Sequence, residues 1–152
     1  ATLFPYTTLF RSEIANREDI FTTGLSVAAP RAFAMAGIHP SDVDFAEIYD
    51  CFTFEVLQQI EEAGFCKRGQ GGAFVEGGRI ELGGALPVNA SGGVLSSNPI
   101  GASGMLRFAE AAMQVRGQAG AHQVEGARVA LGHAYGGGAQ YFAMWIVGRD
   151  KP

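Results

Sequence analysis

The spacing of apolar residues along the chain predicts three helices. Over Thr22–Gly37 apolar residues recur every three or four positions, and the final glycine is placed to end the helix. A second helix is expected over Phe52–Ala63, with Asp50 as its N-cap. A third is expected to end near Gly117. Its predicted inward face consists of Met105, Phe108, Ala109, Ala112 and Met113.

Short, nearly continuous apolar runs predict three strands. Val43–Tyr49 has the composition of a short buried strand. Ala127–Ala134 and Gln140–Val147 flank a glycine-rich turn at Tyr135–Gly138, which is the pattern of an antiparallel hairpin. Because helices and strands alternate along the chain, the predicted class is α/β with a mixed sheet.

Two glycine-rich stretches interrupt these elements. Cys66–Leu86 shows little periodicity, and a loop of this length in a compact domain usually serves function or contains irregular short structure. Val88–Gly104 contains four glycines and is followed at once by the third helical pattern. Glycines let a backbone approach a ligand closely, and a helix start directs free N–H groups into the same space. Val88–Gly104 is therefore the predicted binding loop.

The composition excludes several classes of protein. With 152 residues, of which 47% are hydrophobic and 17% charged, the chain can build one domain with a real core. The formal net charge of −4 and the lack of a basic cluster argue against nucleic acid as a partner. No apolar run reaches the roughly 20 residues of a membrane span, and no signal peptide is present. Two cysteines form no disulfide framework, so a cytoplasmic location is expected.

The first twelve residues, Ala1–Ser12, look foreign to the rest of the chain. They resemble the translation of a sequencing adaptor, and the alternative is a genuine edge strand. If they are foreign, residues 13–152 are a piece of a longer two-domain protein that begins upstream.

The junction between the first strand and the second helix carries the first candidate chemistry. Cys51 would lie in the first turn of the helix, where the helix dipole lowers a thiol pKa and favours a nucleophile or proton carrier. The alternative is a cysteine that only packs in the core.

The predicted binding loop carries the second candidate. Asn98 precedes Pro99 and suits an N-cap, or it could donate a hydrogen bond to a developing oxyanion beside the glycine amides. Asn89 and Ser91 either shape the loop or contact ligand.

The hairpin turn, Gly132–Gly138, carries the third candidate. His133 is either a general base or a core histidine, and Tyr135 could act as an acid or a hydrogen-bond donor. The sequence has no cysteine–histidine set with metal-ligand spacing and no dinucleotide or phosphate-loop fingerprint, so no metal or bound cofactor is expected.

Three segments in order resemble the C-terminal half of the thiolase superfamily. They are Tyr49–Phe52, the loop Val88–Gly104, and Gly132–Gly138. The Asp-Cys-Phe within the first segment is closest to sterol-carrier-type thiolases and thiolase-like lipid-transfer proteins. The resemblance implies a layered αβα fold with a mixed five-stranded sheet, here truncated, and a homodimer in the full-length protein.

The resemblance also assigns roles by position. In thiolases a cysteine of the N-terminal half is acylated, while a histidine and a second cysteine assist. Cys51 is retained as the acid/base cysteine of sterol-carrier-type thiolases, whereas Asn98 stands at the loop histidine and His133 at the final cysteine. The resulting catalytic candidates are Cys51, His133, Asn98, Tyr49 and Tyr135. The expected substrate-binding residues are Asn89, Ser91, Gly92, Gly93 and Gly136.

The leading functional interpretation is an acyltransferase acting on acyl-CoA thioesters by Claisen condensation or thiolysis, with the chain alone inactive. Coenzyme A thioester is then a substrate, and no cofactor is bound. One alternative is a retro-aldolase acting on steroid side-chain CoA thioesters, with Tyr49 or Tyr135 transferring protons and a small OB-fold partner subunit. The other is a lipid or acyl-CoA transfer protein without catalysis.

Overall fold

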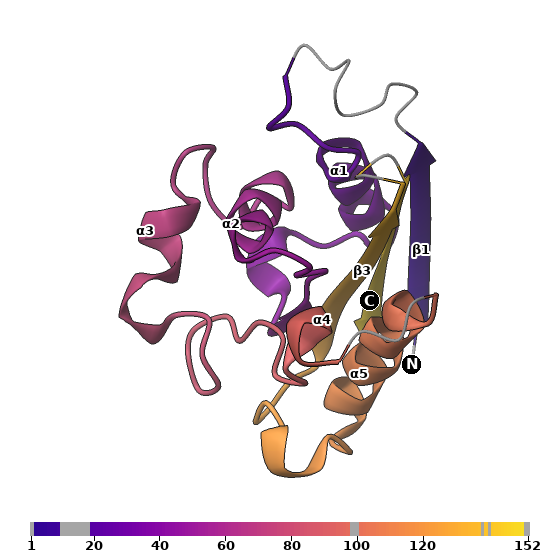
Figure 1. Cartoon of the computed structure of the whole chain (residues 1–152). Coiled ribbons are helices and arrows are strands. Elements are labelled where there is room, and N and C mark those ends of the chain that lie inside the picture. The colour runs from indigo at the N-terminus through magenta and orange to yellow at the C-terminus, as the bar shows by residue number, and fades with distance from the viewer. Residues whose placement is uncertain (1, 10–18, 98–100, 138, 140, 151–152) are drawn as a thin grey trace.

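The computed structural model describes residues 2–9, 19–97, 101–137, 139 and 141–150 (Figure 1). The strands are β1 (Thr2–Leu9), β2 (Phe45–Glu47), β3 (Val129–Gly136) and β4 (Tyr141–Gly148). The helices are α1 (Leu25–Ala36), α2 (Thr53–Glu62), α3 (Gly71–Val75), α4 (Gly93–Ser96) and α5 (Ser103–Arg116). Short 3₁₀ turns occur at η2 (Pro40–Asp42), η3 (Glu76–Gly78) and η4 (Gly120–His122). No helix among these residues is long and apolar enough to cross a bilayer.

The strands form one mixed sheet in the order β1-β4-β3-β2. β2 runs parallel to β3, with Ala46 opposite Leu131. β3 and β4 form the expected antiparallel hairpin, in which Gly132 faces Trp145. The α/β class and the mixed sheet are therefore confirmed, but the sheet formed by the described residues has four strands, so the expectation of five is wrong.

In place of a fifth strand, the described residues form a single parallel bridge beside β2. Val88 pairs with Ala46 there, and the ladder goes no further. Pro87 has no N–H to donate, and Asn89 has a φ of 54°, which turns the chain out of extended conformation. The glycine-rich loop therefore starts where a fifth strand would have continued.

Helices cover both faces of the sheet, which confirms the αβα layering (Figure 1). Side chains of β4 alternate between the two sides, as a strand requires. Phe142, Met144 and Ile146 pack in one core cluster with the inward face of α1. Trp145 and Val147 belong to a second cluster beneath α5.

Thr2–Leu9 forms the edge strand of the sheet, antiparallel to β4. This is the conformation that the alternative interpretation expects of the N-terminal segment. The foreign origin of residues 1–12 stays a prediction, and residues 1 and 10–12 lie outside the described ranges.

The helix expected over Thr22–Gly37 is confirmed and ends on Gly37, whose φ of 67° is left-handed. In α2 the apolar spacing predicts an inward Phe52 and an outward Gln59, and both expectations are wrong. Phe52 precedes the helix and is 63% exposed, whereas Gln59 is buried. Gln59 can be buried because its Nε2 donates a hydrogen bond to the carbonyl of Tyr49 at 2.9 Å.

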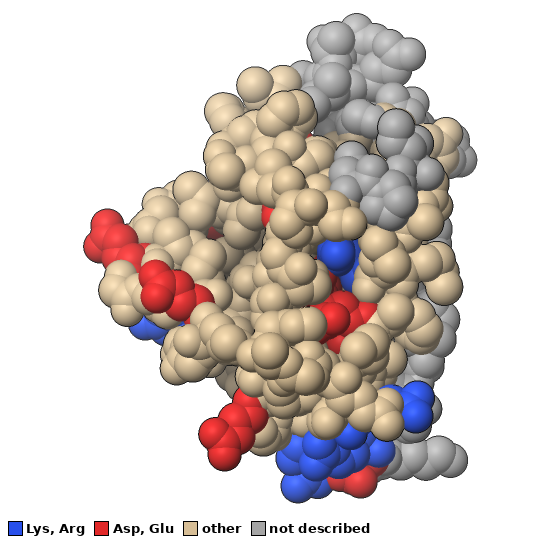
Figure 2. Space-filling view, turned by 60° about the horizontal axis from the view of Figure 1, so that its bottom comes forward, with Lys and Arg blue, Asp and Glu red and all other residues tan. Residues whose placement is uncertain are grey.

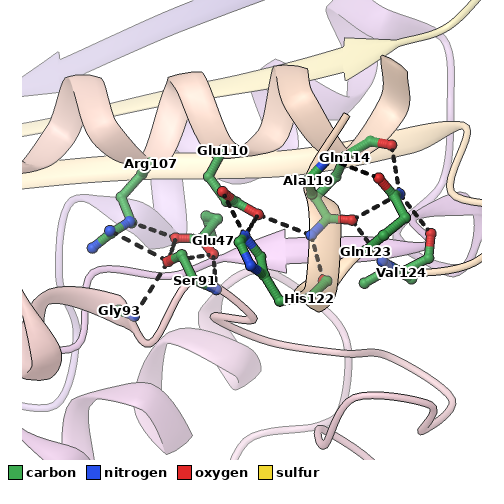
Figure 3. A network of polar contacts seen from close by, with 10 residues as sticks. All are labelled: Glu47, Ser91, Gly93, Arg107, Glu110, Gln114, Ala119, His122, Gln123 and Val124. Carbon is green, nitrogen blue, oxygen red and sulfur yellow. Dashed lines mark hydrogen bonds and ion pairs between the residues drawn. The ribbon is translucent and has the colours of Figure 1, made fainter. Parts of the chain in front are cut away.

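The inward face predicted for the third helix is wrong for Met105, Ala109 and Met113, whereas Phe108 and Ala112 pack against the cluster beneath α5 as predicted. Met105 is 65% exposed and Met113 is also exposed. The buried face of α5 consists of Ser103, Arg107, Glu110, Ala111, Gln114 and Val115. Four of these side chains are polar and are paired with one another or with neighbouring segments (Figure 3). A search for an apolar stripe therefore misses the polar part of the buried face.

Candidate active site

A cavity of about 470 Å³ lies where the carboxyl end of β3 meets the start of α5. Its lining residues are Tyr49, Gly101, Ser103, Gly104, Met105, Ala134, Tyr135, Gly136, Ala143 and Trp145. Three of these, Tyr49, Tyr135 and Gly136, belong to the residues that the sequence singled out. All three predicted segments, Tyr49–Phe52, Val88–Gly104 and Gly132–Gly138, thus contribute residues to one cavity.

Gly104 allows the helix to approach the strand at this cavity. A Cβ on Gly104 would lie 2.5 Å from the Cβ of Ala134 on β3, closer than two carbon atoms can pack. The absence of a side chain therefore sets the spacing between α5 and β3 and, with it, the width of the cavity.

A thiol, a phenol and a carboxylate meet beside the cavity. The Cys51 Sγ lies 2.6 Å from the hydroxyl of Tyr135. Both groups donate to the Oε2 of Glu55, Tyr135 at 2.6 Å and Cys51 at 3.0 Å. We call Cys51, Glu55 and Tyr135 the thiol–phenol cluster.

Tyr49 lies against the thiol–phenol cluster and faces the helix start. Its ring centroid is 4.8 Å from that of Tyr135. Its hydroxyl lies within hydrogen-bond distance, 3.0 Å, of the Oγ of Ser103. Two phenol groups therefore border the same cavity, one linked to Glu55 and the other to Ser103.

Cys51 is not activated by the helix dipole, so that interpretation is wrong. The thiol precedes α2, because Phe52 is the N-cap. Burial and the neighbouring Glu55 raise the pKa of Cys51 to about 11, so the thiol is protonated near neutral pH. Burial and hydrogen bonds to Cys51 and Glu55 also raise the pKa of Tyr135 above its ordinary value.

Asp50 does not cap α2, which is a further correction. Its Oδ1 accepts a hydrogen bond from the Val94 amide at 2.5 Å, in the first turn of α4. A Cβ on Gly93 would overlap the Asp50 carboxylate, so glycine is required at that position. Asp50 therefore ties the binding loop to the strand–helix junction that carries Cys51.

His133 lies in the core and not among the cavity residues. Its side chain is fully buried beside Phe142, and its Nε2 accepts a hydrogen bond from the Tyr49 amide at 3.4 Å. Burial lowers its pKa to about 3, so the ring is neutral at physiological pH. Ala134 lines the cavity from the opposite face of β3, and Tyr135, on the same face as His133, lines it from two residues nearer the end of the strand. This geometry fits the core-histidine alternative, and a catalytic role of His133 stays a prediction.

The polar side chains of the binding loop contact the protein itself. Asn89 Oδ1 accepts from the Ile48 amide at 2.7 Å. Ser91 Oγ donates to the carboxylate of Glu47 at 3.0 Å. Gly92, with a φ of 91°, starts α4. Substrate binding by Asn89, Ser91, Gly92 and Gly93 stays a prediction, and Asn98 lies outside the described residues.

Glu55 and Ser103 are the functional candidates that sequence reasoning missed. Glu55 follows Cys51 at a spacing of four residues, which brings side chains together near a helix start and could have indicated the pair. Ser103 lies in the predicted binding loop, but its contact with Tyr49, 54 residues away, could be found only from the fold. Within the described ranges no group of acidic, histidine or cysteine side chains could hold a metal ion.

A second polar network lies beneath α5 (Figure 3). Arg107 Nε pairs with Glu47 Oε2 at 2.5 Å, and both side chains are buried. Farther along α5, Glu110 contacts His122 at 3.1 Å, and Gln114 Oε1 accepts from the Val124 amide at 2.7 Å. We call this set the α5 network.

The surface carries its charges in small groups. On the face shown in Figure 2, the described Lys and Arg side chains are separated by wide uncharged areas, and red acidic groups accompany some of them. The exposed pair Arg128–Asp150, at 2.5 Å, is one such local arrangement.

The fold and the cavity define an α/β domain with a half-buried thiol beside two phenols at the end of its sheet. Residues 8–149 match the family model described as thiolase C-terminal domain-like. The chain belongs to this family, which confirms the resemblance seen in its three segments.

Curated relatives fall into several functional classes. An acetyl-CoA acetyltransferase of Methanothermobacter thermautotrophicus is 40% identical over 88% of this chain and 36% of its own length. Sterol carrier protein 2 of Rattus norvegicus is 44% identical over 80% of this chain and 22% of its own length. A steroid side-chain-cleaving aldolase of Thermomonospora curvata is 41% identical over 73% of this chain and 27% of its own length. The chain thus spans between 22% and 36% of these relatives.

Solved structures show the same fold. The Ltp2-ChsH2(DUF35) aldolase superposes with a TM-score of 0.85 at 31% identity, covering 97% of this chain and 39% of the other. A monomeric SCP2-thiolase like protein from Mycobacterium smegmatis gives a TM-score of 0.68 at 22% identity over 96% of this chain and 28% of the other, which supports the fold alone.

Proposed function

We propose that the whole protein containing this chain cleaves a carbon–carbon bond in a β-hydroxyacyl thioester of coenzyme A by a retro-aldol reaction. The observation that carries the proposal is Tyr135, which lines the cavity and whose hydroxyl contacts both Cys51 and Glu55. The similarity to two aldolases, one of them across 97% of the chain, supports the same reaction. A steroid side-chain acyl group is the proposed substrate class.

The reaction needs a group that takes a proton from the β-hydroxyl and returns one to the α-carbon. When the hydroxyl loses its proton, its electrons form the carbonyl group, the bond between the α- and β-carbons breaks, and the electron pair passes to the thioester enolate. Protonation of the α-carbon completes the reaction. A single carbon separates the hydroxyl oxygen from the α-carbon, so one phenol can serve both steps. Tyr135 is the proposed group, with the ring of Tyr49 beside it.

Removing the Tyr135 hydroxyl tests this function. Tyr135→Phe keeps the ring contacts with Tyr49 and Phe142 but deletes the proton carrier. We expect cleavage of a β-hydroxylated steroid side-chain CoA thioester by the full-length protein to fall by about 100-fold or more. The carbonyl product and the shortened acyl-CoA are measured by liquid chromatography, without added coenzyme A.

Tyr141→Phe is the matched control, since Tyr141 lies at the start of β4 and is 51% exposed. It should retain wild-type activity. Wild-type protein that leaves this substrate intact, or Tyr135→Phe that cleaves it at the wild-type rate, would contradict the proposal. Binding of the thioester without any turnover would instead favour a transfer protein.

Acyl transfer is the second candidate, favoured by the acetyl-CoA acetyltransferase relative that matches 88% of the chain. It predicts consumption of a β-ketoacyl-CoA together with free coenzyme A. Here the protonated thiol of Cys51 would act as a proton donor to a carbanion, since its raised pKa does not suit a nucleophile. The two candidates are separated by the requirement for free coenzyme A, which the retro-aldol reaction does not consume.

A small partner subunit forms part of the proposal, as does a homodimer of the full-length protein. The solved Ltp2-ChsH2(DUF35) aldolase supports the partner, since it pairs a protein similar to this chain with a second component. Activity assays should therefore use the full-length protein together with any small protein that co-purifies with it.

A further inference from the structure

Glu55 connects the two groups of the thiol–phenol cluster through a single oxygen atom. Its Oε2 accepts from the Tyr135 hydroxyl at 2.6 Å and from the Cys51 thiol at 3.0 Å. Glu55 lies in the first turn of α2 and is half-buried, and it is not among the residues that line the cavity. Any effect of Glu55 on a substrate in the cavity therefore passes through Tyr135.

We infer that Glu55 is the positioning residue that stores the substrate proton during the reaction by accepting the Tyr135 proton and later returning it. This inference rests on the proposed retro-aldol function. Neither the sequence motifs nor the similarity to known proteins assigns a role to Glu55.

All the proton transfers take place among Tyr135, Glu55 and the substrate. The β-hydroxyl proton moves to the Tyr135 oxygen as the Tyr135 proton moves to Glu55 Oε2. The carbon–carbon bond then breaks, and the negative charge that Glu55 gave up resides on the thioester enolate. Glu55 returns its proton to the Tyr135 oxygen as Tyr135 protonates the α-carbon, so the protein ends as it began.

The environment of Tyr135 explains why such a store is needed. Burial and hydrogen bonds raise its pKa, so a free phenolate is disfavoured at this position. With Glu55 as the acceptor, Tyr135 stays neutral during both proton transfers. Cys51 stays protonated and donates to the same oxygen, which holds the carboxylate toward the phenol.

Substitution of Glu55 in the full-length protein tests the inference. Glu55→Gln keeps the size and a hydrogen-bond acceptor but removes the capacity to take a proton. We expect kcat for cleavage to fall by about 100-fold or more while KM changes by less than about threefold, since substrate contacts are retained. Glu55→Asp keeps the carboxylate and should recover at least about tenfold of this loss.

Glu76→Gln is the matched control, because Glu76 lies at η3 and is exposed. It should leave kcat unchanged, and thermal melting should show that all three variants are folded. The contrast between kcat and KM in Glu55→Gln, together with the recovery in Glu55→Asp, separates proton storage from a structural role.

The outcomes distinguish the inference from the function on which it rests. An active wild type with wild-type kcat in Glu55→Gln overturns the role of Glu55 and leaves the retro-aldol function intact. A Glu55→Gln whose KM rises as much as its kcat falls, or a Glu55→Asp as slow as Glu55→Gln, also overturns it. Wild-type protein without cleavage activity contradicts the proposed function itself.

Discussion

Two polar clusters lie on opposite faces of one sheet, and they use buried polarity in different ways. The thiol–phenol cluster lies on the α1–α2 side, is half-buried and borders a cavity. The α5 network lies on the other side, where Glu47 and Arg107 are 0% and 3% exposed and face each other (Figure 3). The density of charged side chains is greater in the α5 network. The proposed reactive site is therefore chosen by its contact with the cavity and not by its charge density.

The α5 network fastens α5 to the rest of the domain. Ser91 donates to Glu47, so the binding loop, β2 and α5 share one buried carboxylate. Gln114 then binds the carbonyl of His122 and the amide of Val124, which fixes the segment after the helix. The thiol–phenol cluster makes no comparable set of backbone contacts. We therefore expect substitutions in the α5 network to change stability and those in the thiol–phenol cluster to change turnover.

Arg107→Met should have the largest effect on stability. It leaves the carboxylate of Glu47 buried without its cation, and breaking such a pair from one side costs about 3–5 kcal/mol. The measurement is the free energy of unfolding of this domain within the full-length protein, from urea denaturation. Glu55→Gln, in the thiol–phenol cluster, should cost less than about 1 kcal/mol in the same assay.

The double variant Glu47→Leu/Arg107→Met tests whether the lost stability comes from the unpaired charge of Glu47 and not from the change in side-chain volume. Replacing both partners with apolar side chains should restore most of the lost stability. A loss below about 1 kcal/mol for Arg107→Met alone would remove the distinction between the two clusters.

Gly104→Ala should lower stability by an intermediate amount and should also change substrate binding. The new Cβ would meet the Cβ of Ala134 at 2.5 Å, so α5 must shift away from β3. Overpacking of this kind costs about 1–3 kcal/mol, and the shift should also raise KM because both residues line the cavity. Denaturation and steady-state kinetics measure the two consequences. Adding Ala134→Gly should reverse both, and a persistent KM defect in the double variant would argue against the spacing role of Gly104.

The comparison also explains which parts of the structure the sequence could predict. The helix α1 and the antiparallel pairing of β3 with β4 depend on local patterns, and both were predicted correctly. The full inward face of α5 was not, because Arg107, Glu110 and Gln114 are buried by partners that only the fold supplies. Cys51 and Tyr135 were found as motif residues. Their link through Glu55 was not, since 80 residues separate Glu55 from Tyr135.

The smallest expected effect is the pH dependence of wild-type stability between pH 4.5 and 6.5, because one buried group on each face opposes the other. Burial raises the pKa of Glu47 from 4.5 to about 7, so the folded state binds more protons and stability falls as pH rises through this range. Burial lowers the pKa of His133 from 6.5 to about 3, so the unfolded state binds more protons and stability rises with pH up to 6.5.

Each group alone would give a slope of up to about 1.4 kcal/mol per pH unit, so their sum between pH 4.5 and 6.5 should stay within about 1 kcal/mol. Single variants separate the contributions of Glu47 and His133 to stability, which are measured by urea denaturation at several pH values. His133→Asn should lose stability as pH rises from 4.5 to 7, and Glu47→Gln should gain stability as pH rises from 3 to 6.5. The slopes are compared rather than the absolute values, because either substitution also changes packing. A flat profile in both variants would show that neither group changes its protonation on unfolding, and the opposition between the two faces would then be absent.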